Sequence, residues 1–253
     1  SFITRLEAQG LASQTIASRL TDLTEAIRVM EPSADLTLLR KISSNMQLRA
    51  SPSRKKNSRI KPPHEIWQAC LCFMRELITS NPTPNMSQSS RYRDALALGL
   101  LALRPLRRRN TSNLILGKHL TLDHGVWNCV IPGEETKDGE AIAFTLPQNH
   151  AFTHVFNRYL TTERQVLLKQ PLLNMEEVSF LRGPLWLTNR CRIMSDHAFY
   201  YAIVRISTEL LGVPINPHLL RDCAVSAISS DAPENILAAS RILGHSNLKT
   251  TLS

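Results

Sequence analysis

A histidine and an arginine near the end of the sequence are spaced so that they could bind one phosphate group. In the stretch NPHLLRDC, Asn216 is a favourable helix N-cap and Pro217 suits the first position of a helix. His218 and Arg221 would then project from one face of the first turns. Because a helix N-terminus attracts anions, a cation and an imidazole beside it would make a seat for phosphate. The pair alone does not identify a site, since HxxR is common by chance.

Three further segments carry basic or ionisable side chains that could join this pair, although each also has a purely structural interpretation. Arginines crowd the segment LRPLRRRN, where they would equally suit a solvated helix end. Lys137, in ETKDGEAIAF, lies at the tip of an expected β-hairpin, which is a common place for an exposed lysine. His245 follows Gly244 in LGHSNLKTT and could simply satisfy the last carbonyls of a helix.

The elements that would position these residues are mostly helices. In ASQTIASRLTDLTEAIRVM, apolar residues recur at steps of three and four and predict a helix from about Ser13. Pro32 and Ser33 end this helix, and LTLLRKISSNMQLRA predicts a second, shorter one. Further helical patterns occupy EIWQACLCFMRELI, RYRDALALGLLALR, HAFTHVFNRYLTTERQVLL, SDHAFYYAIVRISTELLG, NPHLLRDCAVSAIS and DAPENILAASRILG, with a break at NPTPNMSQSS.

One region has a different pattern. In LTLDHGVWNCVIPGEETKDGEAIAFTLP, apolar residues at 126–131 and 141–144 flank turn residues, as in short antiparallel strands. The expected fold class is therefore mainly α with a small antiparallel β-sheet.

A basic segment divides the sequence. The stretch RASPSRKKNSRIKPP has no acidic residue and no apolar period, so we expect a linker over residues 49–61. It would join a helical domain at 1–48 to a larger domain at 62–253. The linker could be a solvated hinge, or it could lie along a phosphate backbone. Its cations are Arg49, Arg54, Lys55, Lys56, Arg59 and Lys61.

The overall composition favours a polyanionic partner. With 30 Lys and Arg against 21 Asp and Glu, the chain has a formal net charge of +9, which suits nucleic acid first and a membrane surface second. No apolar run approaches the roughly 18 residues that span a bilayer, and the N-terminus has no signal-peptide pattern, so we expect an intracellular protein. The five cysteines are expected to be reduced thiols, and Cys70 and Cys72 form a lone CxC without a second ligand pair.

In their order and spacing, PLRRRNTSNL, ETKDGEAIAF, PHLLRDC and LGHSNLKTT resemble the signature of the tyrosine recombinases, also called phage integrases. The resemblance covers about residues 62–253. It extends more weakly to the helical N-terminal segment, which resembles the family's core-binding domain with its first part missing. The implied fold is a recombinase catalytic domain, incomplete at its C-terminus, preceded by a partial core-binding domain.

The resemblance implies a set of catalytic residues. Arg107 is our choice for the family's first arginine because it puts Asn110 where the family usually has Glu and Leu114 at the second apolar position, although Thr111 takes the first. Asp222 stands where many members have another histidine. The implied catalytic residues are Arg107, Lys137, His218, Arg221 and His245, with Arg108 and Arg109 as alternatives to Arg107.

The nucleophile of this family would come next. The resemblance puts its tyrosine about nine or ten residues beyond the second histidine, whereas Ser253 is 8 residues beyond His245. We therefore expect a fragment, inactive as given, that ends just before its nucleophile and, lacking an initial methionine, is also cut at its start. Tyr200 and Tyr201 lie in an apolar helical pattern and are expected to be core or partner-facing aromatics.

The resemblance also implies a reaction. Two arginines would clamp the phosphorane formed when tyrosine attacks a DNA phosphodiester, the lysine would protonate the leaving 5′ oxygen, and the histidines would assist proton movement and donate to the phosphate. No metal or other cofactor is implied. The expected DNA-contacting residues are Arg54, Lys55, Lys56, Arg59, Lys61, Arg108 and Arg109.

The expected protein is a site-specific recombinase or integrase of a mobile element or phage, working through a 3′-phosphotyrosyl intermediate. Its partners would be double-stranded DNA and further copies of itself, as a tetramer on paired sites, in the bacterial cytoplasm and nucleoid. We expect no membrane partner. Two alternatives stay open: a type IB topoisomerase, which reseals the same strand, and a nonenzymatic DNA-binding relative that has lost its tyrosine.

Overall fold

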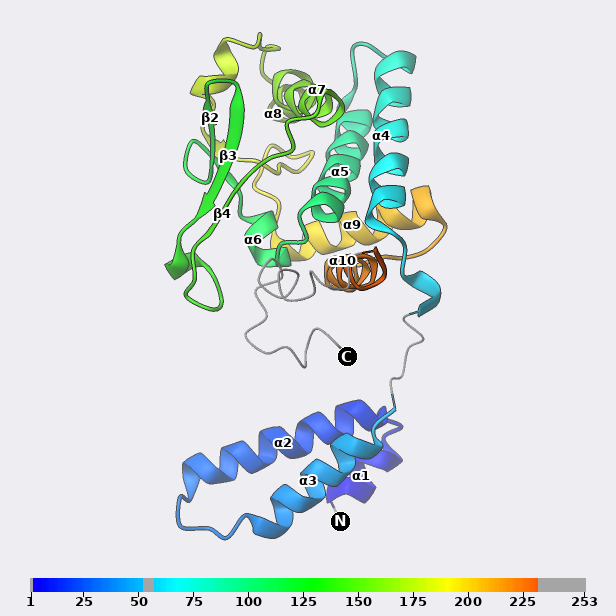
Figure 1. The fold of residues 1–253 in the computed structure, drawn as a ribbon, viewed down its shortest axis with the longest axis vertical. Helices are drawn as coiled ribbons and strands as arrows, with labels where there is room; N and C mark the ends of the chain where they lie inside the picture. The colour runs from blue at the N-terminus through cyan, green and yellow to red at the C-terminus, as the bar shows by residue number, and fades with distance from the viewer. Residues whose placement is uncertain (1, 52–56, 232–253) are drawn as a thin grey trace. The chain divides into compact units, whose positions relative to one another are not determined.

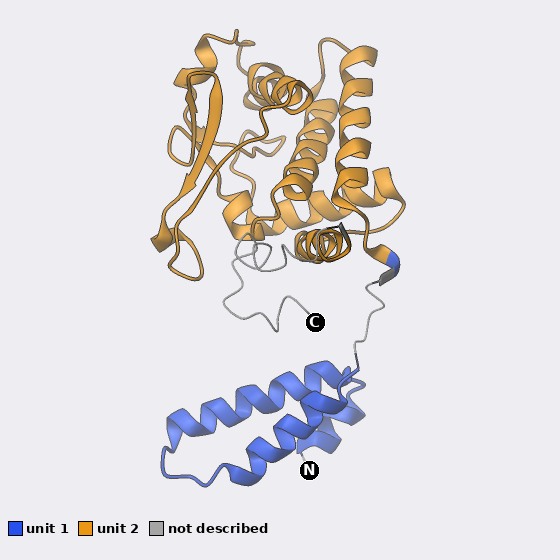
Figure 2. Cartoon of the chain, in the orientation of Figure 1, with its two compact units in different colours: residues 1–58 blue, residues 59–253 orange. Residues whose placement is uncertain are grey.

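The computed structural model describes residues 2–51 and 57–231, which are mainly helical with one small sheet (Figure 1). The chain divides into two compact units, residues 1–58 and 59–253 (Figure 2). The boundary between them falls inside the predicted linker. The last predicted helical pattern, DAPENILAASRILG, lies outside the described residues except for its first position.

The first unit is a group of three helices, α1 (Phe2–Ala8), α2 (Ser13–Met30) and α3 (Thr37–Arg49). The start of α2 at Ser13 confirms the prediction from its apolar spacing. Ile16 and Leu20 of that stripe are buried against Leu6 of α1, and Met46 of α3 packs beside them. Met30, the last member of the stripe, is 82% exposed. Only the first half of the stripe therefore forms core.

In the second unit, α5 (Met86–Leu103) is the central helix. Every residue from Tyr92 to Ala102 is buried, as the all-round apolar stretch from Ala95 to Ala102 requires. It packs against α4 (Pro63–Ser80), where Gly99 leaves room for the ring of Trp67. It also contacts α9 (Asp196–Leu211) and the helical segment 150–168.

The start of α5 differs from the prediction. The sequence suggested a break through residue 90, but the helix begins at Met86. Asn85 and Gln88 form a capping box, in which each side-chain oxygen accepts from the other residue's backbone N–H at 3.0 Å. This first turn is polar, so apolar periodicity does not reveal it.

The sheet is mixed, with the strand order β4-β3-β2-β1-β5, and the prediction of an antiparallel sheet is correct only for part of it. The pairs β2–β3, β3–β4 and β1–β5 are antiparallel, whereas β1 and β2 are parallel. The parallel pairing is limited to Leu116 and Leu120, which face each other across a tight turn where Gly117 has a φ of +78°. The strands are β1 (Ile115–Leu116), β2 (Leu120–Asp123), β3 (Val126–Ile131), β4 (Ile142–Thr145) and β5 (Gly183–Pro184).

One face of this sheet packs on the helices. Trp127 of β3 meets Phe156 edge to face, with ring centroids 5.4 Å apart. The helical segment after the sheet, predicted as one helix, has three parts: α7 (His150–Arg158), the π-helical η3 (Tyr159–Glu163) and α8 (Arg164–Leu168). After a loop region come α9 and then α10 (Pro217–Asp231), whose predicted cap is confirmed because Asn216 Oδ1 accepts from Leu219 N at 2.9 Å.

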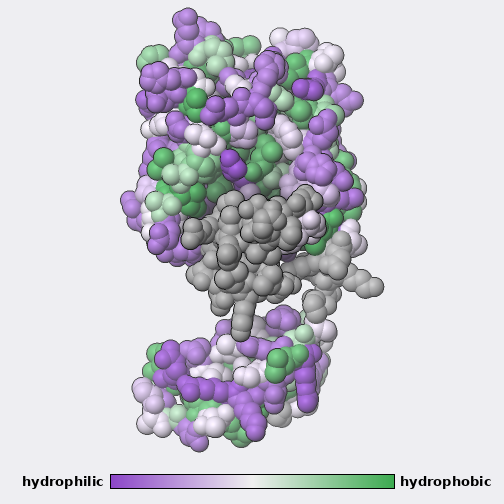
Figure 3. All heavy atoms as spheres, in the orientation of Figure 1, coloured by the Kyte–Doolittle hydropathy of each residue, from purple (hydrophilic) through white to green (hydrophobic). Residues whose placement is uncertain are grey.

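Hydrophilic residues cover much of the described surface in Figure 3, with hydrophobic residues scattered among them. The most exposed apolar side chains of the first unit include Met30 and Leu48. Among the described helices, none is long and apolar enough to cross a membrane.

Candidate functional site

A short helix holds the first predicted catalytic arginine at the surface. Helix α6 (Arg108–Ser112) follows Arg107, whose extended backbone serves as its N-cap. The second half of α6 is buried, and Thr111 is fixed because its carbonyl accepts a hydrogen bond of 2.7 Å from the buried Trp186 indole. Asn110 and Leu114, the positions that selected Arg107 in the sequence, are also buried. This anchoring turns the start of α6 outward.

Arg107 itself is held by a carboxylate from the hairpin loop. Its Nη1 donates to Asp138 Oδ2 at 2.6 Å, and the two side chains are 27% and 31% exposed. Asp138 lies in the loop of residues 132–141 that joins β3 to β4. An ion pair this exposed to water contributes little to stability.

The second predicted arginine lies next to the first. Arg221, in the second turn of α10, is buried, and its Nη1 donates to the carbonyl of Pro105 at 3.1 Å. Burial lowers the pKa of the Arg221 guanidinium, and the charge of Arg107 lowers it further, whereas Asp138 and Asp222 raise it. The two guanidiniums are therefore close enough to repel each other. We call Arg107, Arg221 and Asp138 the arginine site.

Figure 1 shows α6, α10 and the free end of the β3–β4 hairpin at the same end of the second unit, and the contacts of Arg107 and Arg221 confirm that they meet. His218 lies one turn before Arg221 and is exposed. Lys137 is exposed as well, and among the described residues it makes no hydrogen bond or ion pair. The loop thus presents Asp138, not Lys137, to the arginines.

A second ion pair fixes the base of the same loop. Glu135 Oε1 pairs with Lys118 Nζ at 2.6 Å, and Glu135 Oε2 lies 3.1 Å from Nε2 of the buried His119. The hydrogen bond from Lys118 is the main reason that the pKa of the Glu135 carboxyl is lowered. Thr136 adds hydrogen bonds of 2.9 Å to the carbonyls of Gly133 and Glu140. The loop is therefore tied to the β1–β2 turn on one side and to Arg107 on the other.

The next two arginines along the chain, Arg108 and Arg109, have different surroundings from Arg107. Arg108 pairs with Asp196 at 2.6 Å, and its guanidinium lies over the ring of Tyr200, 5.5 Å from the centroid. Arg109 is exposed. Tyr200 is half-buried and Tyr201 is 57% exposed, so neither is the core aromatic that was one of the two expectations for them.

The predicted DNA-binding segment is only partly described. Arg54, Lys55, Lys56 and the catalytic candidate His245 lie outside the described residues. Arg59 Nη1 donates to the carbonyl of Pro214 at 3.4 Å, and Lys61 N donates to Cys223 Sγ at 3.5 Å. The Arg59 guanidinium is thus held by the connection before α10, whereas only the backbone of Lys61 is held by α10, and both residues lie in the same unit as the arginine site.

The lone CxC pair lies on helix α4. Cys70 is buried, which raises the pKa of its thiol to about 12, and Cys72 is exposed on the same helix. No group of three or more potential metal ligands occurs among the residues that the structure describes.

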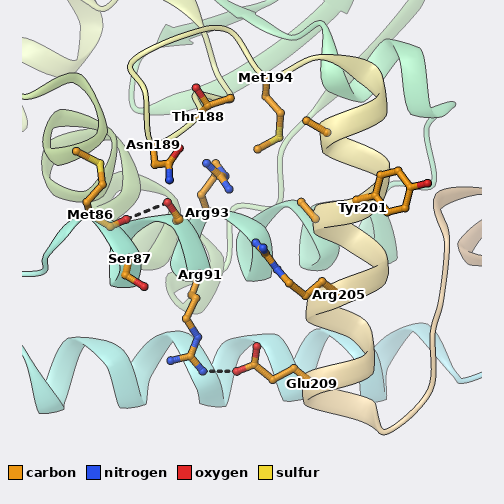
Figure 4. Close-up of a pocket in the computed structure, with 13 residues that line it drawn as sticks. Met86, Ser87, Arg91, Arg93, Thr188, Asn189, Met194, Tyr201, Arg205 and Glu209 are labelled. Carbon is orange, nitrogen blue, oxygen red and sulfur yellow. Dashed lines mark hydrogen bonds and ion pairs between the residues drawn. The ribbon is translucent and has the colours of Figure 1, made fainter.

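A second cluster of arginines lines a groove between α5, α9 and the loop after β5 (Figure 4). The groove has a volume of about 920 Å³ and shares no lining residue with the arginine site. On its floor, Arg93 donates to Asp94 Oδ1 at 2.6 and 2.9 Å, and Arg205 donates to Asp94 Oδ2 at 2.5 Å. Arg91 pairs with Glu209 across the groove. We call it the α5–α9 groove.

Sequence reasoning did not anticipate the acidic partners of either cluster. Asp138 stands directly after Lys137, so the motif that marked the lysine also contained the aspartate. Asp94 follows Arg93 in the same way. Adjacent opposite charges do not by themselves predict a contact: Arg93 pairs with the adjacent Asp94, whereas Asp138 pairs with the distant Arg107.

Comparisons with protein-family models, with curated proteins and with solved structures each found no match.

Proposed function

We propose that this chain belongs to a DNA strand-exchange enzyme of the tyrosine-recombinase type, which cuts and rejoins DNA through a 3′-phosphotyrosyl intermediate. The observation that carries the proposal is the meeting of Arg107 and Arg221, which come from segments more than 100 residues apart in the sequence. Both belong to the motifs that carry the family resemblance. Asp138 offsets part of the charge of the two arginines, and the position of that carboxylate indicates that an anion such as a phosphate could bind there.

The geometry suits a phosphodiester undergoing attack. In that reaction negative charge develops on the nonbridging oxygens of a five-coordinate phosphorus, and guanidiniums can donate paired, charge-assisted hydrogen bonds to those oxygens. Arg221 is buried and oriented by the Pro105 carbonyl, so it needs little reorganisation to bind the developing charge. Arg107 lies nearer to water, where a DNA backbone could reach it.

Further groups for proton transfer lie on the same elements. His218 is one turn before Arg221 and exposed, which would place an imidazole beside the reacting phosphate. Lys137 is one residue from Asp138, so a small rearrangement of the loop would bring its ammonium to the leaving 5′ oxygen. The formal charge of +9 suits a double-stranded DNA partner, with a tetramer on paired sites as the proposed assembly.

The test is the covalent intermediate. Because the resemblance puts the tyrosine after Ser253, the experiment uses a chain extended past that residue by its own coding sequence. This protein is incubated with fragmented DNA of its source in the presence of a chelator, then denatured, and covalently bound DNA is recovered. We expect DNA joined through its 3′ phosphate, with a free 5′ hydroxyl on the other strand end. Absence of an adduct, attachment at a 5′ phosphate, or a strict requirement for a divalent ion would contradict the proposal.

A further inference from the structure

The carboxylate of Asp138 occupies the position at the arginine site that the proposed function gives to a phosphate. It accepts from Arg107 at 2.6 Å and acts electrostatically on Arg221 as well. Asp138 thus presents an oxygen to one arginine and a negative charge to both, as a DNA phosphate would.

The loop that carries Asp138 has more contacts at its base than at its tip. Glu135 is tied to Lys118, and Gly133 lies so close to the Gly139 carbonyl that a side chain there would clash. At the tip, Lys137 and Asp138 are surface residues. The pair between Arg107 and Asp138 is the only ion pair that holds the tip among the described residues.

We infer that Asp138 is an internal anion that holds Arg107 in the absence of DNA and that a phosphate must displace. The identity of the displacing phosphate as DNA rests on the proposed function. Displacement frees the tip of the loop, and the residue next to Asp138 is Lys137, so the same movement that removes a negative charge can deliver a positive one. The site would therefore be inhibited by its own loop until DNA arrives.

The exchange is energetically reasonable. The ion pair is about one-quarter to one-third exposed, so water and salt already weaken it. A phosphodiester has two nonbridging oxygens and can accept from both arginines at once, whereas Asp138 hydrogen-bonds to Arg107 from a single oxygen. A phosphate thus has the advantage once other contacts hold the DNA nearby.

The test follows the Arg107 guanidinium directly. The 253-residue chain is titrated with inorganic phosphate while the side-chain nitrogen resonances of Arg107 are observed by NMR. Three proteins are compared: the natural chain, Asp138→Asn, and Asp123→Asn. The last is the matched control, because Asp123 is an exposed aspartate of the same sheet whose removal changes the net charge equally.

In Asp138→Asn, the phosphate concentration at half-saturation should fall about three- to fivefold, as expected for removal of one competing surface ion pair. In Asp123→Asn it should stay close to that of the natural chain. Equal responses of the two variants, or no response of Asp138→Asn, would overturn the inference. The spectra themselves report whether each variant is folded.

The two proposals can fail separately. If Asp138→Asn binds phosphate more tightly but the extended chain forms no adduct with DNA, the internal anion stands and the proposed function falls. If the adduct forms and the two aspartate variants respond alike, the proposed function stands and the internal anion falls.

Discussion

Two arginine clusters of the second unit hold their carboxylates in opposite ways. In the α5–α9 groove, Arg93 and Arg205 share Asp94, whose side chain is 2% exposed and belongs to the central helix. At the arginine site, Arg107 is paired with Asp138, whose side chain is 31% exposed and belongs to a loop. A carboxylate on a buried helix cannot move away without leaving a buried arginine unpaired. A carboxylate on a surface loop can instead turn toward the solvent. The first cluster therefore serves the fold, and the second is open to exchange with a bound anion.

The largest expected effect on the free energy of unfolding is at the α5–α9 groove. Asp94→Ala should destabilise the second unit by about 3–5 kcal/mol, because it leaves the buried Arg93 guanidinium without its carboxylate. Urea unfolding followed by tryptophan fluorescence measures this unit alone, since Trp67, Trp127 and Trp186 all lie in it. Asp123→Asn, on an exposed strand end, should stay within about 0.5 kcal/mol of the natural chain. A decrease in the free energy of unfolding of less than 1 kcal/mol for Asp94→Ala would contradict the contrast between the two clusters.

A third buried carboxylate gives an intermediate effect that depends on pH. Burial raises the pKa of the Glu163 carboxyl above its ordinary value of 4.5, although Arg158 Nε donates to its Oε1 at 3.0 Å. The folded chain therefore holds a proton that the unfolded chain releases, so this group's contribution to stability falls as pH rises above about 4.5. Glu163→Gln has no such proton, and its stability relative to the natural chain should increase with pH.

Urea unfolding at pH 5 and pH 7.5 checks this, with the exposed Glu134→Gln as a control that should show no comparable trend. If the stability of Glu163→Gln relative to the natural chain decreased toward higher pH, the surroundings would favour the charged form of Glu163, which would contradict this expectation.

The smallest expected effect is on the stability of the arginine site. Asp138→Asn should change the free energy of unfolding by less than about 1 kcal/mol, because a partly exposed ion pair contributes little. The same fluorescence-detected unfolding measures it beside Asp94→Ala. A loss as large as that of Asp94→Ala would mean that Asp138 is a structural residue and that the contrast between the two clusters does not hold.

Much of the helical fold could be predicted from the sequence, because the signals were local. The apolar stripe from Ser13 located α2, and the Asn216–Pro217 pair located the start of α10. The signals failed where the structure depends on polar or distant contacts. The polar first turn of α5 relies on a capping box, and the two-residue strands β1 and β5 are too short to have a period.

The candidate site shows the same division. Motifs selected Arg107 and Arg221, and burial of Thr111 and Leu114 agrees with the spacing used to choose among the three arginines. The motifs did not reveal that Asp138, instead of Lys137, faces Arg107. That contact depends on how a turn orients two adjacent side chains, which residue types alone do not determine. Whether the motifs also identify the activity stays a prediction.

The most direct test of the central claim compares the two clusters by adduct formation. In the extended chain, Arg107→Ala and Arg221→Ala should each reduce the rate of covalent DNA attachment about 100-fold or more, as loss of one donor to a developing oxyanion does. Arg205→Ala removes an arginine of the α5–α9 groove and serves as the matched control, since Asp94 keeps its pair with Arg93. It should leave the adduct rate nearly unchanged, and all three variants should still bind DNA. Equal adduct rates for Arg221→Ala and Arg205→Ala would contradict the account.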